Sequence, residues 1–225
     1  MQRIKKNAEA VEKQVAQSLI KANRQKSEVQ IIVVTKSVSV DDTQAIAALG
    51  YHHLAENRPE GLQLKQEAVT DPAIVWHYIG SLQTRKVKQV INKIDYLHSL
   101  DRWSLAKEIE KRADHVIRCF LQVNVTGEES KSGLRPEETE QFLSDLQSFN
   151  NIEVIGLMTM APKEADEEAL HKTFRSLKQL QETLKQKAFS NAPCTELSMG
   201  MSQDYPIAIE EGATFVRIGT AFFEE

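Results

Sequence analysis

The strongest constraint on the fold is a regular alternation of short apolar runs with helical stretches. The predicted strands are VQIIVVTK (29–36), YHHLAEN (51–57), IVWHYIG (74–80), YLHSLD (96–101), IRCFLQVNV (117–125), IEVIGLMTM (152–160), CTELSMGMS (194–202) and FVRIGTAFF (215–223). Helical segments such as 41–50, 102–112 and 166–187 lie between them. This alternation predicts an α/β fold with a parallel sheet. Eight such units close a TIM barrel, so we predict one (β/α)8 barrel domain over residues 1–225.

The two ends of the sequence fit a closed barrel. Residues 3–24 read as a polar, amphipathic helix, and the sequence ends in FFEE, only two residues beyond the eighth predicted strand. We therefore expect no helix after that strand, and we predict that the N-terminal helix completes the outer ring. An open doubly wound sheet is the alternative. It predicts a glycine-rich turn after the first strand, but KSVSVDD follows there.

Composition narrows the function classes. The 225 residues carry a formal charge of −4, which argues against a protein built mainly to bind nucleic acid. No apolar run is long enough for a membrane span, and no signal sequence is recognisable. Cys119 and Cys194 are far apart and form no CxxC pair. These features predict a cytoplasmic protein with reduced thiols.

Polar, small or sulfur-bearing residues gather where the predicted strands end. They are Thr35, Lys36, Glu56, Asn57, Arg58, His77, Gly80, Ser99, Asp101, Gln122, Asn124, Met158, Thr159, Met160, Ser198 to Ser202, Arg217, Gly219 and Thr220. The opposite ends show no such pattern. Because a TIM barrel builds its active site at the carboxyl ends of its strands, this asymmetry indicates a functional site.

Lys36 has two interpretations. Alternation along the strand places Ile32, Val34 and Lys36 on one face. The lysine could simply extend its charged end into solvent. Alternatively, it could be a desolvated amine at the barrel mouth that attacks an aldehyde to form a Schiff base.

The segment LSMGMSQDYPIAIEEG (197–212) passes from a strand end into a helix. Ser202 could be an ordinary helix N-cap. The other interpretation is a phosphate site, in which backbone N–H groups and the Ser202 hydroxyl face an anion. The loops after strands seven and eight are a frequent phosphate site in this fold, and Gly200 lies in the first of them.

Arg217 interrupts the eighth apolar run. A buried guanidinium needs an acceptor, which could be a structural carboxylate such as Glu56 or Asp101, or a ligand atom. Gly219 permits close backbone approach, and the Thr220 hydroxyl can donate to a phosphate oxygen.

The histidines do not predict a metal site. His52 and His53 are adjacent, so on a strand they face opposite ways. His77 and His98 lie on separate predicted strands without ligand-like spacing. We expect His77 to be a polar wall residue.

Taken together, these segments resemble the pyridoxal phosphate (PLP) homeostasis protein family. The similar blocks are VVTKSVS, AENRPEG, WHYIGSLQTRKVK, LQVNVTGEESKSG, GLMTMAP, LSMGMSQDYPIAIEEG and VRIGTAFF, in the family's order. The resemblance implies a barrel of the fold-type-III PLP proteins, with PLP as the cofactor.

The resemblance also implies residue roles. Lys36 would hold PLP as an internal aldimine, and Arg217 would face the pyridine nitrogen and keep it unprotonated. The phosphate would be bound by Ser202, Gly219 and Thr220. The implied pocket further includes Asn57, His77, Met158 beneath the ring, and Ser198, Met199 and Gly200 in the phosphate loop.

Three departures from the family pattern stand out. Ala55 replaces the usual glycine of GENR, and Arg85 replaces the usual asparagine of LQxNK. The chain ends in FFEE, where many members continue with a glycine-containing tail.

The resemblance implies a PLP carrier in intracellular PLP (vitamin B6) and amino-acid homeostasis, without catalytic turnover. Fold-type-III enzymes add a second β-domain and dimerise, and we expect neither in a chain that stops after the barrel. We expect a monomer that binds PLP, with PLP-dependent apoenzymes or signalling proteins as candidate partners and no nucleic-acid or membrane partner. Three alternatives stay open: a small PLP-dependent amino-acid racemase, a class I aldolase with Lys36 as its Schiff-base lysine, and a module that only binds proteins.

Overall fold

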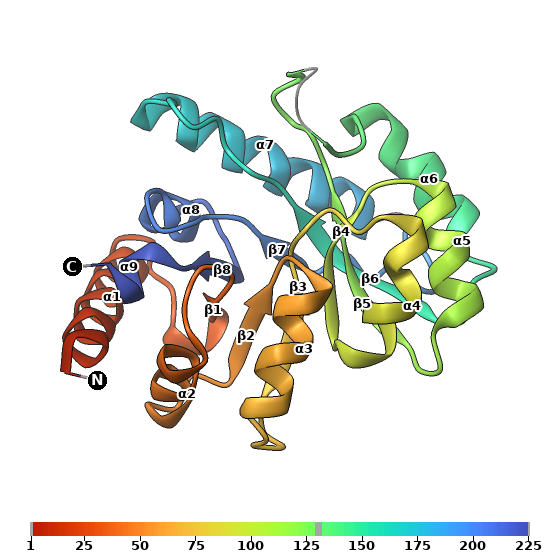
Figure 1. The fold of residues 1–225 in the computed structure, drawn as a ribbon. Coiled ribbons are helices and arrows are strands. Elements are labelled where there is room, and N and C mark those ends of the chain that lie inside the picture. Colours follow the sequence, from red (N-terminus) through yellow and green to blue (C-terminus); the bar gives the residue numbers. More distant parts are fainter. Residues whose placement is uncertain (1, 129–131, 225) are drawn as a thin grey trace.

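The protein forms a closed eight-stranded parallel barrel (Figure 1). A computed structural model describes residues 2–128 and 132–224. Each strand pairs with the next, and the first pairs with the last. The strands are β1 (Gln30–Val34), β2 (His53–Glu56), β3 (Val75–Tyr78), β4 (Tyr96–Leu100), β5 (Ile117–Gln122), β6 (Ile152–Met158), β7 (Glu196–Ser198) and β8 (Phe215–Ile218). The predicted TIM barrel is confirmed.

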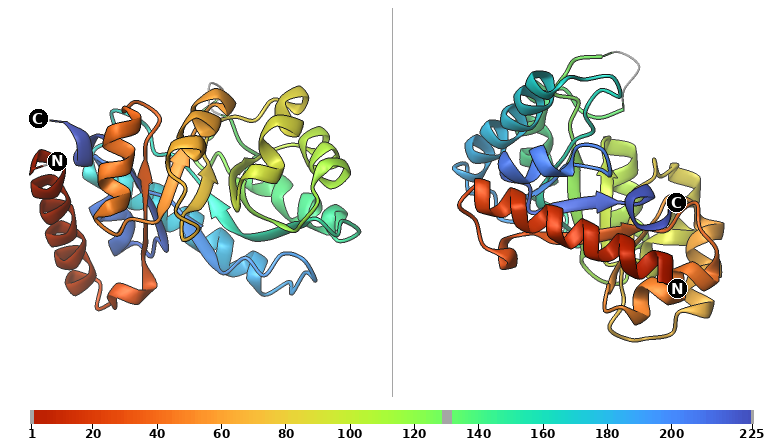
Figure 2. Two further views of the ribbon diagram at one scale, coloured as in Figure 1. Left: turned by 60° about the horizontal axis from the view of Figure 1, so that its bottom comes forward. Right: turned by 90° about the vertical axis from the view of Figure 1, so that its left-hand side faces the viewer.

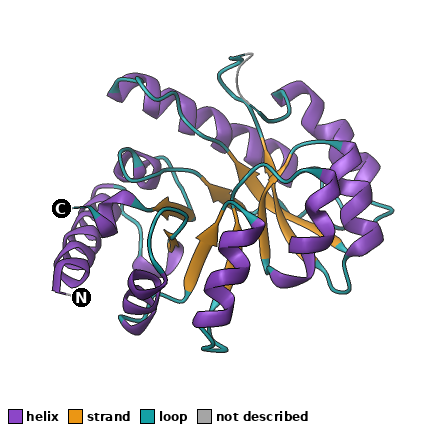
Figure 3. Cartoon of the chain, viewed as in Figure 1, coloured by secondary structure: helices purple, strands orange, loops and turns teal. Residues whose placement is uncertain are grey.

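Helices surround the strands on the outside (Figure 3). The α-helices are α1 (Gln2–Lys21), α2 (Val40–Ala48), α3 (Pro59–Ala68), α4 (Val87–Val90), α5 (Trp103–Arg112), α6 (Thr139–Leu146), α7 (Glu167–Lys185), α8 (Tyr205–Glu210) and α9 (Thr220–Phe223). Single 3₁₀ turns lie at Lys26–Glu28, Thr84–Lys86, Ile91–Lys93 and Pro136–Glu138. Within 2–128 and 132–224, every helix is too short or too polar to cross a membrane.

Alternation along the strands divides the core into two layers. Ile32 and Val34 pack with Ala55 in a small cluster inside the barrel. Ile31 and Val33 belong to the larger cluster between the sheet and the helices. The period-2 prediction for the first strand is therefore correct, and it directs the next residue on the inner face toward the barrel mouth.

Helix α1 completes the outer ring, as predicted. It packs beside α8 and α9 (Figure 2). Ile4, Val11 and Val15 are buried along its inner face. The Asn7 side-chain amide donates to the carbonyl oxygens of Phe222 (3.1 Å) and Glu224 (2.8 Å).

The prediction for the end of the chain was wrong in one respect. The eighth strand stops at Ile218, and the predicted strand residues 220–223 form α9. The Ser202 hydroxyl accepts the backbone N–H groups of Gly219 and Ala221, which turns the chain out of the sheet. A short helix therefore follows the eighth strand.

Candidate functional site

Lys36 lies in the turn after β1, two residues beyond Val34. Its side chain is exposed, and its amine has no hydrogen bond or ion pair with any residue that the structure describes. The predicted position at the barrel mouth fits this placement. The expectation of a desolvated amine does not, because Lys36 extends past the end of the sheet into solvent. The amine is free to react with a ligand.

The strand end before Lys36 is held by a buried ion pair that the sequence pattern did not predict. The Lys65 ammonium contacts Glu56 at 2.6 Å, and the two side chains are 4% and 2% exposed. Lys65 also donates to the Thr35 carbonyl, and the Thr35 hydroxyl donates to Glu56 (2.7 Å). Lys65 projects inward from α3, which amphipathic patterning could not distinguish from a solvent-facing lysine. The cluster fixes the backbone that carries Lys36.

Arg217 is a buried cation at the same end of the barrel, 4% exposed. Its guanidinium donates to the Ser198 hydroxyl (2.6 Å) and the Thr159 carbonyl (3.0 Å). Burial lowers the pKa of Arg217 to about 10, although Asp204 opposes this. A guanidinium has five N–H donors, so acceptors in the protein use only part of its capacity.

The two suggested carboxylate partners of Arg217 are engaged elsewhere. Glu56 pairs with Lys65, and Asp101 pairs with Arg102 at 2.6 Å. The structural-carboxylate interpretation is therefore wrong for both. A buried guanidinium with donors to spare fits an electron-rich ligand atom.

Ser202 connects the loop after β7 to the start of α9. Its hydroxyl oxygen accepts the N–H groups of Gly219 (3.1 Å) and Ala221 (3.3 Å). The hydroxyl proton is therefore left to donate to an anion. Ser202 is not the N-cap of α8, a place taken by Asp204. An open hollow of about 340 Å³ lies here, lined by Asn7, Ser202, Gln203, Thr220, Ala221 and Glu224.

Three more of the predicted site residues, Gly200, Met199 and Met158, have structural positions around this loop and in the barrel interior. Gly200 has φ +93°, and a Cβ there would stand 2.6 Å from Ala208 Cβ. Met199 is fully buried in the outer core, so it shapes the loop from behind. Met158 packs inside the barrel with Phe120, where the resemblance places it beneath a ligand ring.

Asn57 and His77 differ in how deeply their side chains are buried. Asn57 is half-buried at the end of β2. His77 is fully buried, and its two ring nitrogens lie 2.9 Å from nitrogens of His53 and His98. We expected His77 to line the wall of the ligand pocket. It lies in the barrel interior instead, and both of its ring nitrogens face other histidines. The barrel brings together three histidines that the sequence left on separate strands.

These histidines do not form a metal centre. Among residues 2–128 and 132–224, no group of three or more histidine, cysteine, aspartate or glutamate side chains has the arrangement to hold a metal ion. The histidine nitrogens face each other in pairs, as hydrogen-bond partners do.

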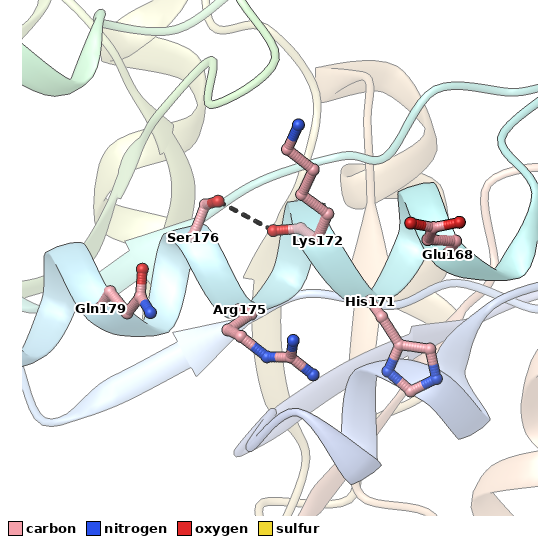
Figure 4. Close-up of a pocket in the computed structure, with 6 residues that line it drawn as sticks. All are labelled: Glu168, His171, Lys172, Arg175, Ser176 and Gln179. Atoms are coloured by element: carbon pink, nitrogen blue, oxygen red, sulfur yellow. Dashed lines mark hydrogen bonds between the residues drawn. The ribbon is translucent and has the colours of Figure 1, made fainter.

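A second open hollow, of about 330 Å³, lies on the outer face of α7 (Figure 4). His171 and Arg175 are both held there by Glu211, at 2.7 and 2.6 Å. Lys172 points to the opposite side of the helix. The hollow lies outside the barrel, and its His171 and Arg175 side chains are already paired with Glu211, so it is not part of the candidate site.

Comparison with known proteins identifies the family. The family described as "Alanine racemase, N-terminal domain" matches residues 3–225. A pyridoxal phosphate homeostasis protein of Aquifex aeolicus is 38% identical over 208 residues, covering 91% of this chain and 90% of that protein. The chain belongs to the pyridoxal phosphate homeostasis protein family.

Solved structures agree with this family assignment. PipY of Synechococcus elongatus PCC7942, solved with PLP bound, has a TM-score of 0.83 and 31% identity, covering 93% of this chain and 99% of that one. Alanine racemase from Corynebacterium glutamicum has a TM-score of 0.70 at 15% identity, and this chain covers 60% of it. The second likeness shows a shared fold only.

Two departures from the family pattern can be placed in the structure. The Ala55 methyl is fully buried inside the barrel beside Ile32 and Val34, so it adds packing at the end of β2. Arg85 is exposed, and its guanidinium donates to the Gln83 side chain (3.0 Å). It makes a local surface contact where the family has an amide.

Proposed function

We propose that this protein binds PLP through Lys36 and acts as a carrier in intracellular PLP and amino-acid homeostasis. The observation that carries this proposal is the free amine of Lys36 at the carboxyl-terminal end of the barrel. At the same end, the buried guanidinium of Arg217 has N–H donors that no acceptor in the described part of the chain uses. The sheet register supports it, because Arg217 pairs with Ile32 of the strand that leads to Lys36. The homeostasis names of the relatives and the PLP-bound PipY point the same way.

The residues present fit the chemical groups of PLP. When bound, PLP supplies an aldehyde that a neutral lysine amine can attack with loss of water. Lys36 would hold that end. Ser202 would donate its hydroxyl proton to the phosphate; Thr220 borders the same hollow, and the Gly219 N–H is held by Ser202. Arg217 would donate one of its unused N–H groups to the ring nitrogen and, as a permanent donor, would keep that nitrogen unprotonated.

The exposure of Lys36 favours a carrier over an enzyme. Proton abstraction next to an amine needs a site that excludes water. An amine open to solvent instead allows the aldehyde to arrive and leave reversibly. A racemase of this fold remains the second candidate, and it rests on a shared fold at 15% identity.

The first experiment is an absorbance spectrum. Wild-type protein mixed with PLP should turn yellow, and borohydride should bleach it and add the reduced adduct mass to Lys36. The Lys36→Ala variant should do neither. A colourless wild type, or colour retained in Lys36→Ala, would contradict PLP binding through Lys36. A colourless protein that binds sugar phosphates would favour the aldolase alternative.

A second experiment separates carrier from racemase. The loaded protein is incubated with single L-amino acids in deuterium oxide and followed by NMR. The carrier proposal predicts no catalytic α-deuterium exchange and no D-isomer. Sustained turnover that disappears in Lys36→Ala would establish the racemase instead.

Two further features belong to the proposal. We place the protein in the cytoplasm, because its two cysteines are buried and apart and the described helices lack a membrane span. We also propose a monomer, which light scattering of the purified chain tests directly.

A further inference from the structure

A continuous hydrogen-bonded chain of side chains crosses the inside of the barrel. His53 Nδ1 lies 2.9 Å from His77 Nε2, and His77 Nδ1 lies 2.9 Å from His98 Nε2. His98 Nδ1 lies 2.8 Å from the Ser198 hydroxyl, which accepts from Arg217 at 2.6 Å. We call these five residues the interior chain. It connects the start of β2 with the buried guanidinium of the candidate site.

Burial disfavours the charged form of all three imidazoles of the interior chain. His77 and His98 are fully buried, and burial holds the pKa of each well below 6.5. Burial also lowers the pKa of the half-buried His53. Ring packing supports them: Tyr96 stacks on His77 at 4.5 Å and Phe120 on His98 at 4.4 Å. A neutral imidazole has one donor and one acceptor nitrogen, so each ring can pass a hydrogen bond along the chain.

Arg217 sets the direction of the chain. A guanidinium can only donate, so the Ser198 oxygen must accept from it. Among the hydrogen bonds of the described residues, the only acceptor left for the Ser198 hydroxyl proton is His98 Nδ1. An unused buried hydroxyl donor would cost about 1–3 kcal/mol. The proton of His98 is therefore on Nε2.

The positions of the protons on His77 and His53 follow from that of His98. His98 Nε2–H donates to His77 Nδ1, so the proton of His77 must also be on Nε2. His77 Nε2–H then donates to His53 Nδ1. All three histidines have the same tautomer, and every hydrogen bond points from Arg217 toward His53.

We propose that the interior chain is a positioning device for Arg217, in which His98 and His77 hold the Ser198 hydroxyl in the one orientation that accepts from the guanidinium. This contact, with the one to Thr159, determines which N–H groups of Arg217 remain for the ligand. The effect of the interior chain on ligand binding rests on the proposed function. The tautomer order is a property of the chain alone.

The first test uses ligand-free protein labelled with ¹⁵N-histidine. Long-range ¹H–¹⁵N NMR at neutral pH should show His53, His77 and His98 protonated on Nε2 only, with assignments from His53→Gln, His77→Gln and His98→Gln. A proton on Nδ1 of His98, or a doubly protonated ring in the interior chain, would overturn the proposal. This result does not depend on whether PLP binds.

The second test compares His98→Asn with His98→Leu. The amide oxygen of asparagine can occupy the acceptor place of Nδ1, whereas leucine offers no acceptor. We expect His98→Leu to weaken PLP binding about tenfold, the loss of roughly one hydrogen bond to a charged group, and to shift the PLP absorbance band. His98→Asn should restore both toward wild type.

Tyr96→Phe is the matched control, because it keeps the ring stacked on His77 without altering the interior chain. Equal spectra and affinities for His98→Asn and His98→Leu would overturn the positioning role and leave His98 as packing only. A wild type that binds no PLP would instead overturn the proposed function, and the NMR result would stand.

Discussion

Two lysines near the end of β1 have opposite environments. Lys65 is buried against Glu56 and the Thr35 carbonyl, whereas Lys36, the next residue after Thr35, is exposed and unpaired within the part of the chain that the structure describes. The buried lysine is structural because its charge is neutralised by Glu56 and it also donates to the Thr35 carbonyl. The exposed one has no partner for its amine among the described residues. This contrast assigns reactivity to Lys36 rather than to Lys65.

Removing one partner of the buried pair should be costly. We predict that Lys65→Met lowers the free energy of unfolding by about 3–5 kcal/mol, because Glu56 is left as a buried charge without a counter-charge. Urea denaturation measures this. The double variant Glu56→Gln/Lys65→Met should recover much of the loss. A single variant as stable as wild type would contradict the pairing.

Ser202 should contribute to ligand binding more than to folding. We predict that Ser202→Ala weakens PLP binding about tenfold, because it removes a hydroxyl that can donate to the phosphate and organises two backbone N–H groups. Isothermal titration or absorbance titration measures this. Ser176→Ala is the control, since within the described part of the chain that hydroxyl bonds only to the Lys172 carbonyl on α7. Equal affinities for both variants would remove Ser202 from the site.

At the scale of elements, the sequence predicted all eight strands but placed their carboxyl ends too far along. The seventh was predicted over 194–202, and β7 covers only Glu196–Ser198. Apolar or β-branched residues continue past most of the strand ends, so propensity cannot show where the ladder stops. The ends are decided by contacts distant in sequence, such as that of Ser202 with Gly219.

The site could be predicted in part for the same reason. Lys36 and Arg217 are recognisable because a charge follows or interrupts an apolar run. Lys65 and the histidine contacts are not, because they depend on strand register and on which way a helix faces. His53 and His77 meet only because β2 and β3 pair in the register that sets Ala55 opposite His77.

The junction of α1 with α9 depends on one side chain. We predict that Asn7→Ala lowers stability by about 1–2 kcal/mol, because it removes two hydrogen bonds to the Phe222 and Glu224 carbonyls. Hydrogen exchange should rise in α9 and much less in β4. Lys6→Ala, an exposed neighbour on α1, should change neither. Unchanged exchange in α9 would show that apolar packing alone holds this junction.

At the scale of the whole molecule, the buried histidines link folding to pH. The pKa of His77 and of His98 lies well below 6.5 in the folded chain because burial disfavours the charged rings. An unfolded histidine binds a proton near its ordinary pKa of about 6.5. The unfolded chain therefore holds more protons as the pH falls below that value. The stability these rings contribute is complete above about pH 6.5 and is lost as the pH falls toward their folded pKa.

We predict that the free energy of unfolding falls between about pH 6.5 and 5, approaching roughly 2.7 kcal/mol per pH unit if two protons are taken up on unfolding. Asp204, whose pKa burial raises, acts with the opposite sign in the range where it titrates. Urea denaturation at stepped pH values measures it. His98→Leu should show about half of the wild-type pH slope, even if its free energy of unfolding is lower at every pH. The slope depends on the number of protons taken up on unfolding and not on the contacts that the substitution removes. A flat profile in wild type would mean that His77 and His98 are not buried as neutral rings, and the interior chain would lose its basis.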